Sequence, residues 1–412
     1  MHFIIIGAGL AGLYTAKLLT EKNHKVTVIE ARDRVGGRTF TKNKIDLGGQ
    51  WVSSQQKRVM KLLSELGIEY FPQFDEGNHI MNFGKTEIYD GNISASQKNF
   101  IEELNKLSNY YESYQTLKTK ACDFLKMNCT DEKTKRMIEW LFKVCICVES
   151  DELPFVFWLY FLKSCGGYEK ISDIRNGAQE YRIKGGSMSI SEKLSKNLNV
   201  HLNEPVRIIF QNASGCIVKT DKNSYKCDKV IVTIPLSFNE KIVYSPPLPP
   251  SKTDFIQNTK MGSVIKIVVI YKEPFWRMGG YSGEIISDQP PIFLSYDCST
   301  NDYYGLVTFV CAKDIPHYSK QKILEGFAKY FNDKRALTPL EYHEKNWAED
   351  EYSGGCYFAT FDVSRRGELQ KSFGNIHWAG TETANEWMGY MEGALESGER
   401  VVNEIFLSKS KL

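Results

Sequence analysis

The sequence predicts an α/β protein in which one domain is assembled from separate stretches of the chain. Three observations lead to this expectation. A strand, a glycine-rich loop, a helix and a second strand occupy residues 3–30, a helical stretch at about residues 94–162 interrupts them, and strands return before a final strand, turn and helix. Strands that alternate with helices are typical of an open parallel sheet covered by helices.

The first unit has the order strand, helix, strand. It consists of an apolar strand at residues 3–6, a loop with the spacing GxGxxG, a helix at residues 13–20 and a strand at residues 25–29. A glycine pattern alone is weak evidence, because an ordinary tight turn can carry it. With both strands and the helix in place, the pattern predicts a dinucleotide-binding loop.

Each glycine of this loop has its own task. Gly7 permits the tight turn, Gly9 lets the backbone approach a pyrophosphate, and Gly12 lets the helix pack closely on the strand. The N–H groups at the start of the helix face the phosphates. Glu30 ends the second strand and is placed to accept hydrogen bonds from a ribose. These residues leave open which dinucleotide binds.

The later elements follow from apolar periodicity and from glycine and proline breaks. Helices are expected at residues 55–66, within 94–162, and at 187–198, 321–331 and 390–406. Strands are expected at residues 206–210, 216–220, 230–233, 264–271 and 305–310, and a strand followed by a turn at residues 376–381. The proline-rich run at residues 246–250 is a stiff boundary and not a strand.

Composition excludes several classes of protein. Among 412 residues, 52 Lys and Arg balance 50 Asp and Glu, so a nucleic-acid-binding surface is not expected. The ten cysteines form no facing CxxC pairs, so neither a metal site nor a disulfide framework is expected. No apolar run approaches the roughly 20 residues of a membrane span. We therefore expect a soluble, cytoplasmic protein without a membrane anchor.

Three further segments suit a cofactor site. The first is residues 35–39 (VGGRT), the second is residues 46–51 (DLGGQW), and the third is residues 379–394 (AGTETANEWMGYMEGA). Paired glycines beside Arg38 suit a backbone that runs close to a diphosphate or a ring. The helix expected from about Tyr390 can stabilise negative charge on a reduced ring at its N-terminus.

Together these segments resemble the flavin-dependent amine oxidases. Residues 262–266 and 271–276, and residues 344–347 and 352–357, are similar to the monoamine oxidases in particular. The resemblance covers residues 3 to about 405. It implies a Rossmann-type FAD-binding domain, plus a substrate domain of helices and a mixed sheet. It also implies oxidative deamination of primary or secondary amines to aldehydes through an imine, with O2 reduced to H2O2. The expected partners are a small amine and O2, and the chain is expected as a homodimer.

The resemblance also implies the cofactor-binding residues. Glu30 would contact the adenosine ribose, the backbone of Val206 would contact the adenine, and Cys356 would form a thioether to the flavin. The expected set is Gly7, Gly9, Ala11, Gly12, Glu30, Ala31, Arg32, Gly37, Arg38, Gly49, Gln50, Trp51, Val206, Trp347, Cys356, Gly380, Thr381, Glu382, Gly389, Tyr390 and Met391.

The residues expected at the reacting centre are Lys266, Tyr357 and Tyr390. A lysine inside an apolar strand is costly unless it has a task or a partner. The resemblance places Lys266 beside the flavin N5 through a water, where it assists reoxidation by oxygen. It places Tyr357 and Tyr390 face to face, as a slot whose π faces attract the amine nitrogen.

The substrate cavity implied by the resemblance is mostly apolar. Gln179 would orient the amine, and Cys145, Ile171 and Phe309 would line the cavity, with Val144, Ser172, Ile286 and Leu294 at or near it. The chain departs from the family at two places. Trp51 stands where monoamine oxidases have a tyrosine, and Ser172 stands where they have a bulkier gate residue. The size of the cavity is therefore open.

Three alternatives stay open at this point. A polyamine oxidase on the same fold would use acidic residues such as Glu149 or Asp151, and an amino-acid oxidase would need a cation for the carboxylate. A flavin-binding scaffold without catalysis would not need Lys266, Tyr357 and Tyr390. The sequence also leaves open whether C–H cleavage is a hydride transfer or a polar nucleophilic step.

The expected domain boundaries follow from the order of the elements. The FAD-binding domain is expected at residues 1–71, 184–255 and 350–412, and the substrate-binding domain at residues 72–183 and 256–349.

Overall fold

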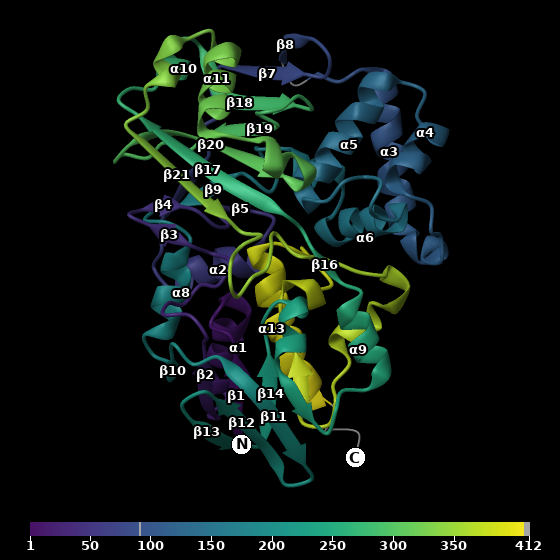
Figure 1. Cartoon of the computed structure of the whole chain (residues 1–412), viewed down its shortest axis with the longest axis vertical. Coiled ribbons are helices and arrows are strands. Elements are labelled where there is room, and N and C mark those ends of the chain that lie inside the picture. Colours follow the sequence, from purple (N-terminus) through teal and green to yellow (C-terminus); the bar gives the residue numbers. More distant parts are fainter. Residues whose placement is uncertain (90–91, 408–412) are drawn as a thin grey trace.

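The computed structural model describes residues 1–89 and 92–407 (Figure 1). A five-stranded parallel sheet in the order β10-β2-β1-β14-β23 lies in the lower part of the view. Its strands are β1 (His2–Ile6), β2 (Lys25–Ile29), β10 (Val200–His201), β14 (Lys229–Val232) and β23 (Ile376–Trp378). One sheet thus combines strands from the beginning, middle and end of the chain.

Two helices from opposite ends of the sequence cover this sheet together. Helix α1 (Leu10–Glu21) follows the glycine loop, and α13 (Met391–Leu407) packs against it. Their apolar side chains join those of β1 in one buried cluster that includes Phe3, Leu13 and Val401. Strands buried on both faces read as continuous apolar runs, which is why residues 3–6 contain no polar side chain.

The upper part of Figure 1 contains a seven-stranded mixed sheet in the order β21-β17-β20-β19-β18-β7-β8. Its strands are β7 (Asn78–Asn82), β8 (Thr86–Tyr89), β17 (Val264–Tyr271), β18 (Tyr281–Ser287), β19 (Leu294–Asp297), β20 (Tyr304–Cys311) and β21 (Glu341–Asn346). Every residue of β17 is buried. Strand β17 lies between β21 and β20, and Lys266 at its third position is buried.

A group of helices lies beside this sheet, at the upper right of the view. It comprises α3 (Ala95–Asn109), α4 (Ala121–Asn128), α5 (Glu132–Ile146), α6 (Phe155–Cys165) and α7 (Tyr168–Ser172). Helix α6 is almost wholly buried, and its aromatic rings share a core cluster with Phe309 and Phe358. This shared core fixes the helices against the sheet and against the loop after β21.

The remaining elements connect these parts. The helices are α2 (Lys57–Glu65), α8 (Met188–Ser195), α9 (Pro250–Gln257), α10 (Phe275–Met278), α11 (Lys320–Phe331) and α12 (Gly367–Gln370). The strands are β3 (Thr41–Lys42), β4 (Ile45–Asp46), β5 (Trp51–Val52), β6 (Tyr70–Pro72), β9 (Tyr181–Ile183), β11 (Val206–Asn212), β12 (Gly215–Thr220), β13 (Ser224–Cys227), β15 (Val243–Ser245), β16 (Lys260–Met261) and β22 (Ala359–Thr360).

The predicted α/β architecture is confirmed, and each helix and strand expected from the sequence is present within a few residues of its expected ends. Five strands of the large sheet were not predicted, namely β7, β8, β18, β19 and β21. Strand β21 is polar because it lies at the sheet edge, and β18 is interrupted by Gly283 at φ +91°. Both features hide the apolar alternation that identifies a strand.

Candidate active site

One elongated cavity runs from the glycine loop to the large sheet. Its nucleotide end is lined by residues of the parallel sheet and its loops, among them Gly7, Gly9, Leu10, Ala11, Glu30, Ala31, Arg32, Gly37, Val206 and Thr233. We call the opposite part the amine end. It is lined by Trp140, Leu141, Val144, Cys145, Ile171, Ser172, Gln179, Leu294, Tyr296, Phe309, Tyr357 and Tyr390. The cavity therefore joins segments more than 300 positions apart in sequence.

The glycine loop turns its open side to this cavity. Gly7 has φ +105°, a conformation that favours glycine. A Cβ added at Gly9 would meet no atom within 4 Å, so the backbone there is open to a ligand. A Cβ added at Gly12 would lie 2.0 Å from the Gly7 carbonyl oxygen, so Gly12 serves close packing behind the loop. With helix α1 starting at Leu10, this geometry fits a pyrophosphate at the helix N-terminus.

Glu30 is buried and fixed by the backbone. Its Oε2 accepts a hydrogen bond from Ala8 N at 2.7 Å, and its Oε1 accepts one from Arg32 N at 2.9 Å. A carboxylate oxygen can accept more than one hydrogen bond. Because Glu30 also lines the cavity, it can take a ribose hydroxyl as a further donor.

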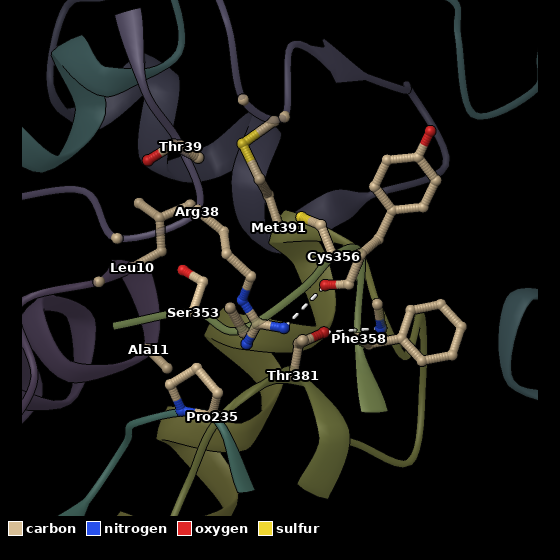
Figure 2. Close-up of a pocket in the computed structure, with 18 of the residues that line it drawn as sticks. Leu10, Ala11, Arg38, Thr39, Pro235, Ser353, Cys356, Phe358, Thr381 and Met391 are labelled. Atoms are coloured by element: carbon tan, nitrogen blue, oxygen red, sulfur yellow. Dashed lines mark hydrogen bonds between the residues drawn. The ribbon is translucent and has the colours of Figure 1, made fainter. Parts of the chain in front are cut away.

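Arg38 fastens the wall in the middle of the cavity. Its Nη1 donates to Glu382 Oε1 at 2.6 Å and to the Tyr357 carbonyl oxygen at 2.7 Å, and its Nη2 donates to Glu382 Oε2 at 3.1 Å. In Figure 2 the guanidinium group lies between the segment of Cys356 and that of Thr381. The paired charges therefore hold two segments of the wall together.

Thr381 ties the start of helix α13 to the same wall. Its Oγ1 accepts a hydrogen bond from Gly389 N at 2.7 Å and donates to the Tyr390 carbonyl oxygen at 3.0 Å. Gly389 has φ +90°, and a Cβ there would collide with the Phe358 ring at 2.3 Å. These contacts set the direction in which Tyr390 enters the cavity.

Lys266 is the charged side chain of the cavity with the deepest burial. Its Nζ donates to the Gly48 carbonyl oxygen at 2.7 Å and to Gln50 Oε1. Burial lowers the pKa of Lys266 to about 7, although the Asp46 carboxylate acts in the opposite direction. The amine can therefore exchange a proton close to neutral pH.

Aromatic neighbours hold both tyrosines of the amine end. The Tyr390 ring lies 5.1 Å from the Trp387 ring, edge to face, and 6.4 Å from the Phe161 ring, measured between centroids. The Tyr357 ring meets the Phe309 ring edge to face at 6.4 Å. Burial raises the pKa of both hydroxyls well above the usual value. Both side chains are therefore neutral and cannot act as bases near neutral pH.

Cys356 precedes Tyr357 and also lines the cavity. It is a free, buried cysteine. Burial raises the pKa of its thiol to about 12, while nearby Arg38 acts to lower it. The sulfur is therefore protonated near neutral pH.

Two amide groups in the cavity wall have unused hydrogen-bonding atoms. Gln179 Nε2 donates to the Ile171 carbonyl oxygen at 3.4 Å, while its Oε1 has no partner among the described residues. Gln50 Oε1 accepts a hydrogen bond from Lys266, while Gln50 Nε2 likewise has no partner among the described residues. Buried polar atoms are normally satisfied, so these two point to a ligand in the cavity.

Most of the residues expected from the sequence meet in this cavity. Those that line it are Gly7, Gly9, Ala11, Glu30, Ala31, Arg32, Gly37, Arg38, Gly49, Gln50, Trp51, Cys145, Ile171, Gln179, Val206, Lys266, Phe309, Cys356, Tyr357, Gly380, Thr381, Gly389, Tyr390 and Met391. Three others stand behind the wall. Gly12 packs on Gly7, Glu382 pairs with Arg38, and Trp347 is buried with its Nε1 donating to the Leu47 carbonyl oxygen at 2.9 Å.

Several lining residues were not predicted, including Trp140, Tyr296, Thr233 and Glu204. Thr233 follows β14 at the carboxyl edge of the parallel sheet, where ligands of such folds bind. That rule could have identified Thr233 once the strand was recognised. Trp140 and Tyr296 look like ordinary core residues in the sequence, and only the tertiary fold brings them to the cavity.

Two classes of site are absent from the part of the chain that the structure describes. No cluster of His, Cys, Asp or Glu there could hold a metal ion. Likewise, across residues 1–89 and 92–407, no helix is both long and apolar enough to cross a membrane.

The chain is similar to known proteins over nearly its whole length. The model of the family described as flavin containing amine oxidoreductase matches residues 10–406. The probable flavin-containing monoamine oxidase A of Dictyostelium discoideum is 40% identical, over 98% of this chain and 96% of that protein. The flavin-containing amine oxidase B of Mus musculus is 35% identical, over 99% of this chain and 86% of that protein.

Solved structures have the same fold. Putrescine oxidase bound to putrescine superimposes with a TM-score of 0.93 at 27% identity, over 99% of each chain. Cyclohexylamine oxidase from Brevibacterium oxydans also has a TM-score of 0.93, at 23% identity and over 99% of each chain, a likeness that concerns the fold alone.

Proposed function

Since this chain belongs to the flavin-containing amine oxidoreductase family and is an oxidoreductase acting on amines, we propose that its substrates are apolar primary or secondary monoamines. The amine is oxidised to an imine that hydrolyses to an aldehyde, and O2 is reduced to H2O2. The observation that carries this proposal is the chemistry of the amine end of the cavity.

The amine end suits a substrate with one amino group. Its lining side chains are aromatic, aliphatic or neutral and polar, with no carboxylate or guanidinium among the described ones. A second ammonium group would need a carboxylate there, and an amino acid would need a cation for its carboxylate. Glu149 instead pairs with Lys143 at 3.1 Å and Lys313 at 3.4 Å, outside the cavity wall. This arrangement favours a monoamine over a polyamine or an amino acid.

The residues of the cavity fit FAD. The open Gly9 and Gly49 positions leave room for a close approach of ligand to backbone, and Glu30 is available at the ribose end. Gln50 Nε2, which has no partner in the described part of the chain, supplies a donor at the other end, next to Lys266. When bound there, FAD supplies the acceptor for a hydride equivalent and returns two electrons to oxygen.

The chain's own residues then bind, orient and shield the amine. Tyr357 and Tyr390 offer π faces to the nitrogen. Gln179 Oε1, unpaired within residues 1–89 and 92–407, can accept a hydrogen bond from an N–H of the substrate. The apolar lining excludes water and favours the neutral amine. Lys266 Nζ can hold or release a proton near neutral pH.

We further propose that Cys356 links covalently to the flavin through a thioether. Forming the S–C bond removes one hydrogen from sulfur and one from the ring methyl group, and O2 takes up these two hydrogens as H2O2. Cys356→Ala tests the link. Acid-precipitated native protein should give a yellow pellet, and the variant a colourless pellet with a yellow supernatant. A colourless native pellet would contradict the link.

The domain division is also a proposal. Residues 1–71, 184–255 and 350–412 would form the FAD-binding domain, and residues 72–183 and 256–349 the substrate-binding domain. The parallel sheet draws its strands from the first set and the seven-stranded sheet from the second, which supports the division. The homodimer expected from the sequence is tested by the mass of the protein in solution.

A panel of amines tests the substrate proposal. Peroxide and aldehyde are measured with benzylamine, tyramine, spermine and leucine. We expect turnover of benzylamine and tyramine. Turnover confined to spermine would support a polyamine oxidase, and turnover confined to leucine an amino-acid oxidase. No turnover with any amine would overturn the proposal and favour a flavin-binding scaffold.

A further inference from the structure

The amino group of Lys266 is held by the short segment of residues 48–51. Strand β17 carries Lys266 into the cavity, and the loop after β4 brings two acceptors to its Nζ. These acceptors are the Gly48 carbonyl oxygen, at 2.7 Å, and Gln50 Oε1. The centroids of the Trp51 and Phe309 rings lie 5.6 and 5.9 Å from the same nitrogen. Lys266 is thus enclosed by two acceptors and two aromatic rings.

The two acceptors occupy two of the three hydrogen-bonding positions of Lys266 Nζ. An ammonium group has three N–H donors, and two of them are occupied by Gly48 and Gln50. A neutral amine has two N–H donors and one lone pair. If both donors keep the same acceptors, the remaining position is an N–H in the charged form and a lone pair in the neutral form. That position is the same in both forms, so a proton can leave or return there without rearrangement.

Gln50 is a buried residue of the cavity wall. Its side chain is only 2% exposed, and its neutral amide oxygen accepts from Lys266 without adding a charge. Its Nε2 is buried and has no partner among the described residues, and Gln50 lines the ligand cavity. The glutamine therefore connects Lys266 on one side with whatever occupies the cavity on the other.

We propose that Gln50 is a positioning residue for proton transfer at Lys266. Together with the Gly48 carbonyl oxygen it directs the third valence of Nζ into the cavity in both protonation states. This inference rests on the proposed function, in which oxygen becomes H2O2. Formation of H2O2 from O2 takes two electrons and two protons. The reduced cofactor of the proposed function would supply both electrons and one proton. Lys266 supplies the other proton from its third valence and regains it from water.

Other titratable groups near Lys266 also influence its protonation. Asp46 is buried on β4, where Ser187 N and Thr41 Oγ1 donate to it at 2.9 and 2.6 Å. Arg182 on β9 opposes it, and the thiols of Cys298 and Cys356 complete the set. All four are unchanged by a substitution at Gln50, so a shift in pH dependence can be assigned to that residue.

The test compares Gln50→Glu, Gln50→Met and a matched control. Gln55→Glu is the control, because Gln55 lies five positions away with an exposed side chain and receives the same chemical change. Each enzyme is reduced with dithionite, and its reoxidation by O2 is followed across pH. No amine is present, so failure of this inference is distinguishable from failure of the substrate proposal.

A carboxylate beside Nζ favours the ammonium form, so Gln50→Glu should move the midpoint of the pH profile upward by about 1–3 units. Gln50→Met removes an acceptor from a buried cation and should move the midpoint downward. Gln55→Glu should leave the midpoint unchanged. Lys266→Met should abolish this pH dependence of the reoxidation rate. The absorbance of the resting flavin, titrated with pH, should show the same shifts without turnover.

Two results would overturn the inference. One is a set of Gln50 variants whose midpoints coincide with that of the native enzyme. The other is an equal loss of rate at every pH in both variants, which would give Gln50 a purely structural role. If Gln50→Glu fails to fold, the shift in Gln50→Met still decides between these outcomes.

Discussion

In the proposed function, recognition of the amine depends most directly on the aromatic rings of Tyr357 and Tyr390. Both rings line the cavity, and each packs against other aromatic side chains. Within residues 1–89 and 92–407, neither hydroxyl group forms a hydrogen bond. An interaction of a partly cationic nitrogen with a ring face is worth about 1–2 kcal/mol when water is excluded. The rings, and not the hydroxyl groups, should therefore matter.

Substitutions at Tyr390 separate these two contributions. Tyr390→Phe keeps the ring and should retain most of kcat/KM for benzylamine. Tyr390→Leu removes the π face and should lower kcat/KM roughly ten-fold, in line with about 1–2 kcal/mol. Steady-state peroxide formation measures both. If the phenylalanine variant loses as much as the leucine variant, the hydroxyl group and not the ring is the recognition element.

Among the structural elements, the loop of Cys356 and the start of helix α13 depend on one buried ion pair. Glu382 has a side chain that is 2% exposed, and Arg38 is its partner. Arg38→Met leaves this carboxylate buried without a cation and should lower the free energy of unfolding by about 3–5 kcal/mol. Urea denaturation measures the loss. The double variant with Glu382→Met should regain part of the lost stability, and an equally unstable double variant would contradict this account.

Strands β7 and β18 are joined by a pair whose stability depends on pH. His79 Nδ1 lies 2.5 Å from Glu284 Oε2. The hydrogen bond to Glu284 raises the pKa of His79, and burial raises the pKa of Glu284. The folded protein therefore holds protons that the unfolded chain releases, so the contribution of His79 is complete below pH 6.5 and is lost as pH rises through its raised pKa.

The expected outcome is a free energy of unfolding that falls as pH increases above 6.5. His79→Gln removes the titrating group and should flatten this part of the curve. Urea titrations of both proteins across the same pH range provide the comparison. A native curve that rises in this range would show that other groups dominate.

The elements differ in how far the sequence could reveal them. The glycine loop and β17 were predictable from the sequence. A φ of +105° at Gly7 favours glycine, and a completely buried strand appears as an apolar run. The edge strand β21 and the interrupted β18 leave no such marks. At the site, motifs indicated Lys266, Cys356 and Tyr357, whereas Trp140 and Tyr296 depend on how α5 and β19 pack, which local patterns do not encode.

At the scale of the whole molecule, one cavity extends from the parallel sheet to the seven-stranded mixed sheet. Figure 1 shows the parallel sheet below the seven-stranded sheet. The glycine loop follows β1 of the parallel sheet, and Lys266 and Phe309 lie on the paired strands β17 and β20 of the other sheet. The chain passes several times from one sheet to the other. Neither end of the cavity is therefore complete without the other. This arrangement explains why the nucleotide loop alone could not indicate the reaction, since the groups that surround the reacting atoms come from distant positions.

The cytoplasmic location expected from the sequence remains a prediction, and a fluorescent fusion of the protein tests it. Diffuse cytoplasmic fluorescence would support the expected location. Fluorescence confined to a membrane or an organelle would contradict it.

The central claim is that an apolar monoamine is oxidised in this cavity, and an anaerobic experiment tests it most directly. Benzylamine is mixed with the yellow enzyme without oxygen, the flavin absorbance is followed, and air is then admitted. The account predicts that the amine bleaches the flavin, that aldehyde forms in proportion, and that air restores the colour with an equivalent amount of H2O2. A flavin that stays yellow with benzylamine and tyramine, yet is bleached by dithionite, would contradict it.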